Sequence, residues 1–308
     1  MNKIPVIAIV GVTASGKSEL ALRLCEHIGG EIISGDSMQI YRGMDIGTAK
    51  PTPEEQARVP HHLIDIADIT EAFSVALFVE KAARAAKEIA ARGKMPVVVG
   101  GTGLYIQMLL NGRMLPEMDS NEELRRQLYE KAENEGNQAL HDYLNSIDPE
   151  SAAAIHPNNV KRVVRAIEIY LTTGLTKTQQ NELSRQGVSP FDYKLLYLYS
   201  PDRQFLYDRI NARVDKMMAA GLEEEVRRLY ARGLADTPTA SQAIGYKEFF
   251  PYFEGKIDLD TVVSDIKQHT RNYAKRQITF FNRMENKTVI DISAGSEEVF
   301  QKAIEVCR

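Results

Sequence analysis

The sequence predicts an α/β protein with a P-loop-type doubly wound parallel sheet and an inserted all-helical domain. Three observations predict this fold. An apolar, β-branched run at residues 5–10 leads into a glycine loop and then into a helical pattern. Strand-like and helix-like segments then alternate along most of the 308 residues, which is typical of parallel sheets. Between residues 115 and 190 only helical patterns occur.

The elements of the α/β part follow from local patterns. The first strand, residues 5–10, is apolar at every position, as expected of a strand covered on both faces. Short apolar runs between turn residues predict four further strands: residues 31–34, 96–99, 194–199 and 288–292. Apolar residues at helical spacing predict four helices: residues 18–28, 74–92, 203–232 and 259–284. The alanines of the second helix are interpreted as solvent-side filler. Ligands of such sheets bind at the carboxyl ends of the strands.

The inserted domain is predicted to cover residues 115–190, so that the core is formed by residues 1–114 and 191–308. A polar stretch at 115–119 is interpreted as the linker that enters the insertion. Amphipathic patterns predict three helices within it: residues 122–135, 137–146 and 159–172.

Composition limits the function classes that are compatible with the chain. The formal net charge of −4 gives no general attraction to polyanions, so a nucleic acid must be bound by a local basic patch. Two cysteines, Cys25 and Cys307, suit a reducing compartment and offer no zinc-ligand spacing. No apolar run approaches the ~20 residues that a membrane span needs. We therefore expect a cytoplasmic protein without membrane contact, and a monomer by default.

A phosphate-binding loop follows the first strand. Gly11, Gly16, Lys17 and Ser18 fit the pattern G-x-x-x-x-G-K-[ST], between a strand and a helix as the pattern requires. Backbone N–H groups and the helix N-terminus surround the anion, Lys17 adds a positive charge, and Ser18 can ligate Mg²⁺. We predict a diphosphate site formed by Gly11, Thr13, Ala14, Ser15, Gly16, Lys17 and Ser18.

Asp36 is the acidic residue that we expect beside this loop. P-loop enzymes that hydrolyse nucleotides commonly hold Mg²⁺ with an aspartate at a strand end, but the strand at 96–99 ends in Gly-Gly-Thr. Taken alone, Asp36 is slightly more typical of a turn or a helix cap. Next to a diphosphate, its carboxylate fits a general base or a metal-associated group better.

Six segments carry a resemblance to a known family: GVTASGKS, SGDSMQIYRGMDIGTAKP, VVVGGTGLY, IHPNNVKRVVRAIE, SQAIGYKE and TRNYAKRQITFFNR. They closely resemble the bacterial tRNA dimethylallyltransferases, from residue 6 to about residue 284, and the second segment is the most specific. The resemblance implies transfer of a dimethylallyl group from dimethylallyl diphosphate to tRNA. The acceptor is the exocyclic amine of the adenosine 3′-adjacent to the anticodon, diphosphate is released, and no nucleotide is hydrolysed.

The resemblance also implies roles for individual residues. Asp36 matches the proposed base, Thr102 a contact to the bridging oxygen, and Arg213 a contact to the diphosphate, while Mg²⁺ is the implied cofactor. Without the resemblance, Thr102 is typical of a helix N-cap and Arg213 of a solvated surface residue. Contacts with the target region of the tRNA are expected from Asp36, Ser37, Met38, Gln39 and Thr102.

Two basic regions are candidates for binding the anticodon stem–loop. The segment at 267–283 contains five cations and no acidic residue, and Arg271 and Lys275 lie four apart on one helix face, which suits a phosphate backbone. Four further cations belong to the insertion: Arg125, Lys161, Arg162 and Arg165. The target adenine has to leave its stack to reach a deep diphosphate site.

Two other function classes stay open from the residues alone. An ATP-dependent small-molecule kinase would use the same loop, although the missing strand-end aspartate and the basic helix argue against it. A non-catalytic RNA-binding module with a relict phosphate loop is the second alternative. Release of ADP without RNA would identify the kinase, and failure to transfer a labelled dimethylallyl group would favour the binding module.

Overall fold

The computed structural model describes residues 3–112, 121–185 and 189–307, and its contacts divide the chain into two compact units. The first unit combines Met1–Gly112 with Ser189–Arg308, and the second is Arg113–Val188. The predicted insertion, 115–190, begins and ends two residues later than this second unit. The predicted linker at 115–119 lies outside the described residues.

The first unit contains a sheet of parallel strands in the order β3-β2-β4-β1-β5-β6. The strands are β1 (Ile4–Gly11), β2 (Gly30–Ser34), β3 (His61–His62), β4 (Met95–Gly100), β5 (Phe191–Tyr199) and β6 (Lys287–Asp291). The predicted parallel α/β fold is confirmed. The sequence analysis missed β3, because two residues are too few to show a strand pattern.

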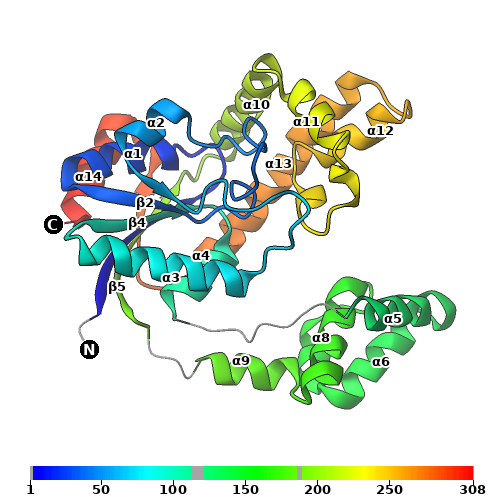
Figure 1. Ribbon diagram of the computed structural model, residues 1–308. Coiled ribbons are helices and arrows are strands. Elements are labelled where there is room, and N and C mark those ends of the chain that lie inside the picture. Colours follow the sequence, from blue (N-terminus) through cyan, green and yellow to red (C-terminus); the bar gives the residue numbers. More distant parts are fainter. Residues whose placement is uncertain (1–2, 113–120, 186–188, 308) are drawn as a thin grey trace. The chain divides into compact units, whose positions relative to one another are not determined.

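Helices cover both faces of the sheet, with α1 and α14 on one side and α3 on the other (Figure 1). The helices of this unit are α1 (Lys17–Ile28), α2 (Pro53–Arg58), α3 (Val75–Ala91), α4 (Gly103–Leu110), α10 (Arg203–Ala219), α11 (Leu222–Tyr230), α12 (Phe250–Phe253), α13 (Leu259–Asn282) and α14 (Ser296–Cys307). Short 3₁₀ turns occur at Leu234–Asp236, Ala240–Gln242, Lys247–Phe249 and Ile292–Ala294. None of the described helices has the length and apolar character needed to cross a membrane.

Two predictions about these helices are wrong. The single helix expected over 203–232 is divided into α10 and α11, because Gly221 adopts a left-handed conformation with a φ of 93°. The alanines of α3 are not solvent-side filler, since Ala82, Ala85 and Ala86 are at most 6% exposed. Their small side chains allow the helix to pack against β1 and β4.

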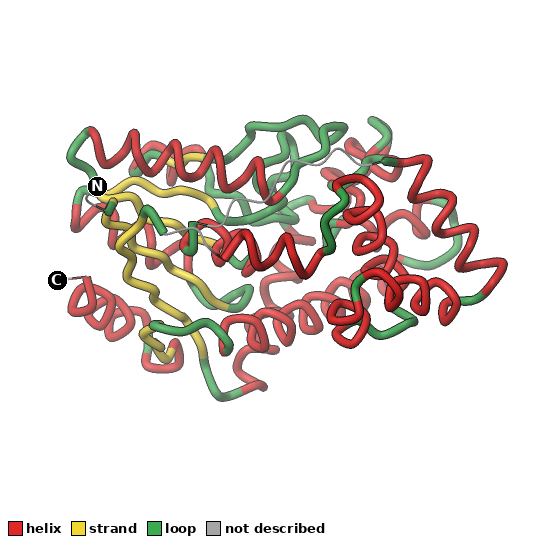
Figure 2. Tube along the Cα trace, turned by 90° about the horizontal axis from the view of Figure 1, so that it is seen from below, coloured by secondary structure: helices red, strands yellow, loops and turns green. Residues whose placement is uncertain are grey.

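The second unit is built from helices and has its own apolar core, whereas all the strands belong to the first unit (Figure 2). Its helices are α5 (Glu122–Glu135), α6 (Asn137–Ile147), α7 (Pro149–Ala154), α8 (Val160–Thr173) and α9 (Lys177–Arg185). Leu140, Leu144, Val163 and Ile167 are fully buried at the centre of this core. Burial of such side chains contributes about 1.5–3 kcal/mol each, so the unit has a substantial driving force of its own.

Candidate active site

Two glycines shape the phosphate-binding loop between β1 and α1. A Cβ on Gly11 would lie 2.5 Å from the carbonyl oxygen of Leu198, so the loop leaves β1 too close to β5 for any side chain. Gly16 forms the N-cap of α1 with a φ of 90°, a left-handed conformation that favours glycine. All the predicted loop residues except Gly11 line a first cavity of about 170 Å³: Thr13, Ala14, Ser15, Gly16, Lys17 and Ser18.

Lys17 and Arg213 bring two positive charges into the wall of this first cavity. Lys17 Nζ donates a 2.6 Å hydrogen bond to the carbonyl oxygen of Val12. Burial and the nearby charge of Arg213 lower the pKa of Lys17 to about 7, against the opposing effect of Asp36. Burial also lowers the pKa of Arg213, and no hydrogen bond or ion pair joins it to the described residues. Desolvated cations that form no ion pair are typical of an anion site.

Asp36 follows β2 and lines the same cavity. Its Oδ1 accepts hydrogen bonds from the N–H groups of Met38 at 2.8 Å and Gln39 at 3.4 Å, which is the turn role that aspartate commonly plays. Its Oδ2 accepts no hydrogen bond from the described part of the chain. The turn therefore uses one carboxylate oxygen and leaves the other for a ligand.

Thr102 links the ends of β2 and β4. It occupies the N-cap position of α4, but its side chain makes no capping hydrogen bond. Its Oγ1 instead accepts a hydrogen bond from the N–H of Ser37 at 3.1 Å and donates one to Ser37 Oγ at 3.3 Å. Ser37 and Met38 line a second cavity, of about 280 Å³, whereas Thr102 lines neither cavity.

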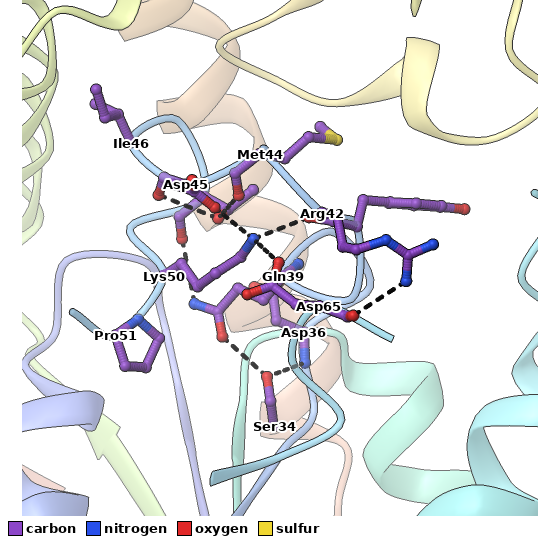
Figure 3. Close-up of polar contacts among 12 residues, drawn as sticks. Ser34, Asp36, Gln39, Arg42, Met44, Asp45, Ile46, Lys50, Pro51 and Asp65 are labelled. Atoms are coloured by element: carbon purple, nitrogen blue, oxygen red, sulfur yellow. Dashed lines mark hydrogen bonds and ion pairs between the residues drawn. The ribbon is translucent and has the colours of Figure 1, made fainter. Parts of the chain in front are cut away.

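The side-chain amide of Gln39 forms hydrogen bonds within the protein, to Ser34 and to the backbone at residues 48–49 (Figure 3). Its Nε2 donates to the carbonyl oxygens of Thr48 at 3.3 Å and Ala49 at 3.2 Å. Its Oε1 accepts a 2.9 Å hydrogen bond from the hydroxyl of Ser34. Gln39 lines the first cavity, but its side-chain amide is hydrogen-bonded within the protein, and its contact with the target region of the tRNA stays a prediction.

The two cavities meet at residues that line both of them: Thr13, Asp36, Thr48, Arg213 and Tyr273. We call this set the junction. The second cavity also has an apolar part: Val214, Met217, Ala243, Ile244 and Ile266. The arrangement suits a diphosphate in the first cavity and an apolar or planar group in the second, with the Asp36 carboxylate between them.

Two residues of α13 complete the site and were missed by the sequence analysis. Gln277 is 4% exposed; its Oε1 accepts a 2.8 Å hydrogen bond from the N–H of Thr13, and its Nε2 donates to the carbonyl oxygen of Gly101 at 3.0 Å. The hydroxyl of Tyr273 donates to the same carbonyl oxygen at 3.2 Å. This helix therefore fixes the phosphate-binding loop to the end of β4. In the sequence, only their four-residue spacing, which puts Tyr273 and Gln277 on one helix face, could have indicated that they act together.

The donor set around Ser18 fits a magnesium ion that arrives with a diphosphate. The described residues contain no group of three or more His, Cys, Asp or Glu side chains that could hold a metal. Ser18 lines the first cavity together with the carboxylates of Glu19 and Asp36. Mg²⁺ is usually bound through one or two protein groups, substrate phosphates and water, so this sparse set is sufficient.

The two residues of the predicted basic face of α13 differ in their surroundings. Lys275 is exposed as expected. Arg271, however, is partly buried, donates a 2.7 Å hydrogen bond to Asn211 Oδ1 and lies over the ring of Tyr207. At least one of the five N–H donors of its guanidinium is thus used within the protein. Arg276, which the sequence pattern did not single out, lines the second cavity.

In the second unit, Arg125 has a structural partner. It donates from Nε to Glu168 Oε1 at 2.9 Å, and Arg165 donates to Oε2 at 2.7 Å. Burial alone would raise the pKa of Glu168, but hydrogen bonds from Arg165 and Arg125 hold it below its usual value. The arginine balances a fully buried carboxylate while its side chain is 32% exposed, and binding of tRNA by Arg125 stays a prediction. Lys161 and Arg162 are exposed at the start of α8.

Fold and site together define a class, the P-loop-type α/β enzymes. Here the cavity beside the loop shares a carboxylate and an arginine with a second, partly apolar cavity. A family profile described as IPP transferase matches residues 39–284. A tRNA dimethylallyltransferase of an Exiguobacterium species is 51% identical, over 99% of this chain and 96% of the relative. The chain belongs to the IPP transferase family and is a transferase, which confirms the resemblance drawn from the six segments.

Solved structures agree with this assignment. A tRNA isopentenylpyrophosphate transferase from Bacillus halodurans has a TM-score of 0.73 and 44% identity, over 98% of this chain and 95% of that one. A eukaryotic dimethylallyltransferase acting on tRNA has a TM-score of 0.79 and 30% identity, over 97% of this chain and 77% of its own.

Proposed function

We propose that the chain transfers a dimethylallyl group from dimethylallyl diphosphate to the exocyclic amine of the adenosine 3′-adjacent to the anticodon of tRNA, with release of diphosphate. The observation that carries this proposal is the junction, where an anion-binding cavity and a partly apolar cavity share Asp36 and Arg213. The names of the relatives, tRNA dimethylallyltransferases, support the same reaction.

In this proposal the first cavity promotes departure of the diphosphate. The bond between the allylic carbon and the bridging oxygen breaks, and its electron pair goes to the diphosphate. Loop N–H groups, Lys17 and Arg213 stabilise that charge as it develops, because they are already in place before the reaction. A bound anion also favours the protonated form of Lys17. Mg²⁺ bound beside Ser18 would supply further positive charge to the leaving group.

The second cavity takes the adenine that has left its stack. Its amine is a weak nucleophile because the lone pair is delocalised into the ring, and it loses a proton as the carbon–nitrogen bond forms. We assign Asp36 Oδ2 as the acceptor of this proton, because Oδ1 is used by the turn. Thr102 contributes by holding Ser37.

Exposed cations are proposed to bind the tRNA backbone, namely Lys161, Arg162 and Lys275, while Arg276 acts inside the second cavity. We further propose that the enzyme works as a monomer, since the loop, the carboxylate and the arginine that the proposed transfer uses are all present in this sequence. A cytoplasmic location is proposed because both cysteines are unpaired, as in a reducing compartment.

Mass analysis of tRNA nucleosides after incubation with unmodified tRNA, dimethylallyl diphosphate and Mg²⁺ tests the proposal. We expect one dimethylallyl group in place of a hydrogen on the adenosine beside the anticodon. Release of ADP from ATP without RNA would point to a kinase instead. Binding of tRNA without any transferred group would point to a non-catalytic RNA-binding protein.

A further inference from the structure

We propose that Lys50 and Glu225 are positioning residues that hold the turn at residues 45–49 and thereby place Thr48 at the junction. Neither residue lines either cavity, so both act through the turn. The inference rests on the proposed function, because it assigns roles in the proposed transfer of a dimethylallyl group.

Lys50 anchors the turn from within its own loop. Its side chain is 3% exposed, and Nζ donates to the carbonyl oxygen of Tyr41 at 2.9 Å. Two carboxylates, of Asp45 and Asp65, accept from the same nitrogen at 2.5 Å and 2.6 Å. Figure 3 shows Lys50 beside Asp45 and Asp65. An ammonium group has three donors, so every donor of this buried cation is used to tie the turn to its neighbours.

Glu225 anchors the turn from α11. It is 1% exposed, and its carboxylate accepts hydrogen bonds from the N–H of Ile46 at 2.8 Å and of Gly47 at 3.2 Å. The hydroxyl of Tyr246 donates to the same carboxylate at 2.6 Å. Burial and the nearby charge of Glu225 raise the pKa of Tyr246, which keeps its hydroxyl a donor. Glu225 therefore connects the turn to Tyr246 and the segment around it.

Tyr246 also packs directly on the turn. A Cβ on Gly47 would lie 2.4 Å from a carbon of the Tyr246 ring, so the backbone passes the ring at a distance that only glycine permits. The residues just before Tyr246, at 242–245, line the second cavity, as do Gly47 and Thr48 of the turn. One carboxylate thus joins two segments that both form the wall of that cavity.

Lys50 and Glu225 act on the site through Thr48, which belongs to the turn and lines both cavities. Its Oγ1 donates a 2.7 Å hydrogen bond to the carbonyl oxygen of Met44, which closes the turn. Gly47 and Thr48 line the second cavity, and Thr48 and Ala49 line the first. The turn is therefore a wall shared by both reactants. A misplacement of about 1 Å between reacting groups lowers a rate by about 10²-fold, so loosening the turn should act on kcat.

The test compares Lys50→Met and Glu225→Gln with two matched controls. Glu224→Gln and Lys87→Met change exposed residues of the same types. We expect kcat for the transfer to fall about 10- to 100-fold in the first pair and to stay unchanged in the controls. KM for tRNA should change less than about threefold, because phosphate contacts dominate that affinity. The dissociation constant of inorganic pyrophosphate should change as little, because the phosphate-binding loop keeps its own anchors.

Assays are run below the unfolding transition of every variant, so that a purely structural role leaves kcat unchanged. Normal kcat in folded Lys50→Met and Glu225→Gln would overturn the assignment. If Glu225→Gln does not fold, Tyr246→Phe decides, since it removes one hydroxyl and keeps the ring; an unchanged kcat there overturns the role of Glu225. A wild-type chain that transfers no group would overturn the proposed function and this assignment together, whereas an active wild type with unchanged variants overturns the assignment alone.

Discussion

The junction of the first unit and the core of the second unit treat buried charge in opposite ways. In the second unit, the fully buried carboxylate of Glu168 receives hydrogen bonds from Arg125 and Arg165. In the first, burial lowers the pKa of Lys17 and Arg213, and no carboxylate of the described residues forms an ion pair with either. A charge balanced by its own chain supports the fold. A desolvated charge that stays unbalanced marks the place where a ligand of opposite sign binds.

Removing the proposed base, Asp36, should have the largest effect on transfer. Asp36→Asn keeps an oxygen that can accept the hydrogen bond from Met38, so the turn is retained. The variant cannot accept the amine proton, and we expect the transfer rate to fall about 10²- to 10⁴-fold. Affinity for tRNA, measured by filter binding, should change little. Near-normal turnover would remove Asp36 from the role of base.

The contrast between the two regions is tested next by removing one charge from each. Arg213→Met should lower kcat about 10²- to 10³-fold, because it removes a group that stabilises the departing diphosphate. Its melting temperature should not fall, since no partner is left unpaired.

Glu168→Gln should behave in the opposite way. We expect a loss of about 1–3 kcal/mol in the free energy of unfolding by denaturant, below the full cost of breaking a buried pair because the two arginines are partly exposed. Transfer kinetics under folding conditions should be normal. The contrast fails if Arg213→Met unfolds the chain, or if Glu168→Gln abolishes transfer without loss of stability.

A third effect concerns the pH dependence of anion binding. The pKa of Lys17 is about 7 without a ligand, and a bound diphosphate raises it because the charged form is favoured. Above pH 7, binding then takes up a proton, so the affinity for pyrophosphate falls by up to about tenfold per pH unit. Calorimetry in buffers of different ionisation enthalpy measures this uptake. In the control variant Lys17→Arg the side chain stays charged, so any remaining pH dependence of the affinity comes from the ionisation of pyrophosphate. Identical pH profiles of affinity for the wild type and this variant would contradict the prediction.

The smallest effect separates two neighbours on α13. Lys275→Ala should reduce the slope of log affinity for tRNA against log salt by somewhat less than about one unit, as expected for one lost phosphate contact. Arg271→Ala should change the slope less, because its guanidinium is partly buried, donates to Asn211 and lies 6.0 Å from the centre of the Tyr207 ring. Equal slopes for the two variants would contradict the prediction that Lys275 contributes more than Arg271 to the contacts with tRNA phosphates.

Local patterns were sufficient to predict the sheet and the phosphate-binding loop. Apolar strands, glycines and the Gly16-Lys17-Ser18 sequence specify their conformation through near neighbours. The contacts that complete the site are different, because Gln277 bonds to Thr13 across 264 positions and Glu225 to Ile46 across 179. On the sequence, both belong to ordinary amphipathic helices.

Charged residues showed the same limit. Arg125 and Lys161 look alike in sequence, yet one is held by a buried carboxylate and the other is exposed. Arg213 sits in a charged helix, and only its position at the junction distinguishes it from a surface arginine. Partners of charges are set by tertiary packing, which periodicity does not encode.

The account depends on a diphosphate and an adenine meeting at Asp36. A crystal structure of the chain with a non-hydrolysable analogue of dimethylallyl diphosphate and an anticodon stem–loop is the most direct measurement. We predict the diphosphate against Lys17 and Arg213, with the exocyclic amine of the flipped adenine within hydrogen-bonding distance of Asp36. A diphosphate bound away from the loop, or an adenine whose amine faces away from Asp36, would contradict the account.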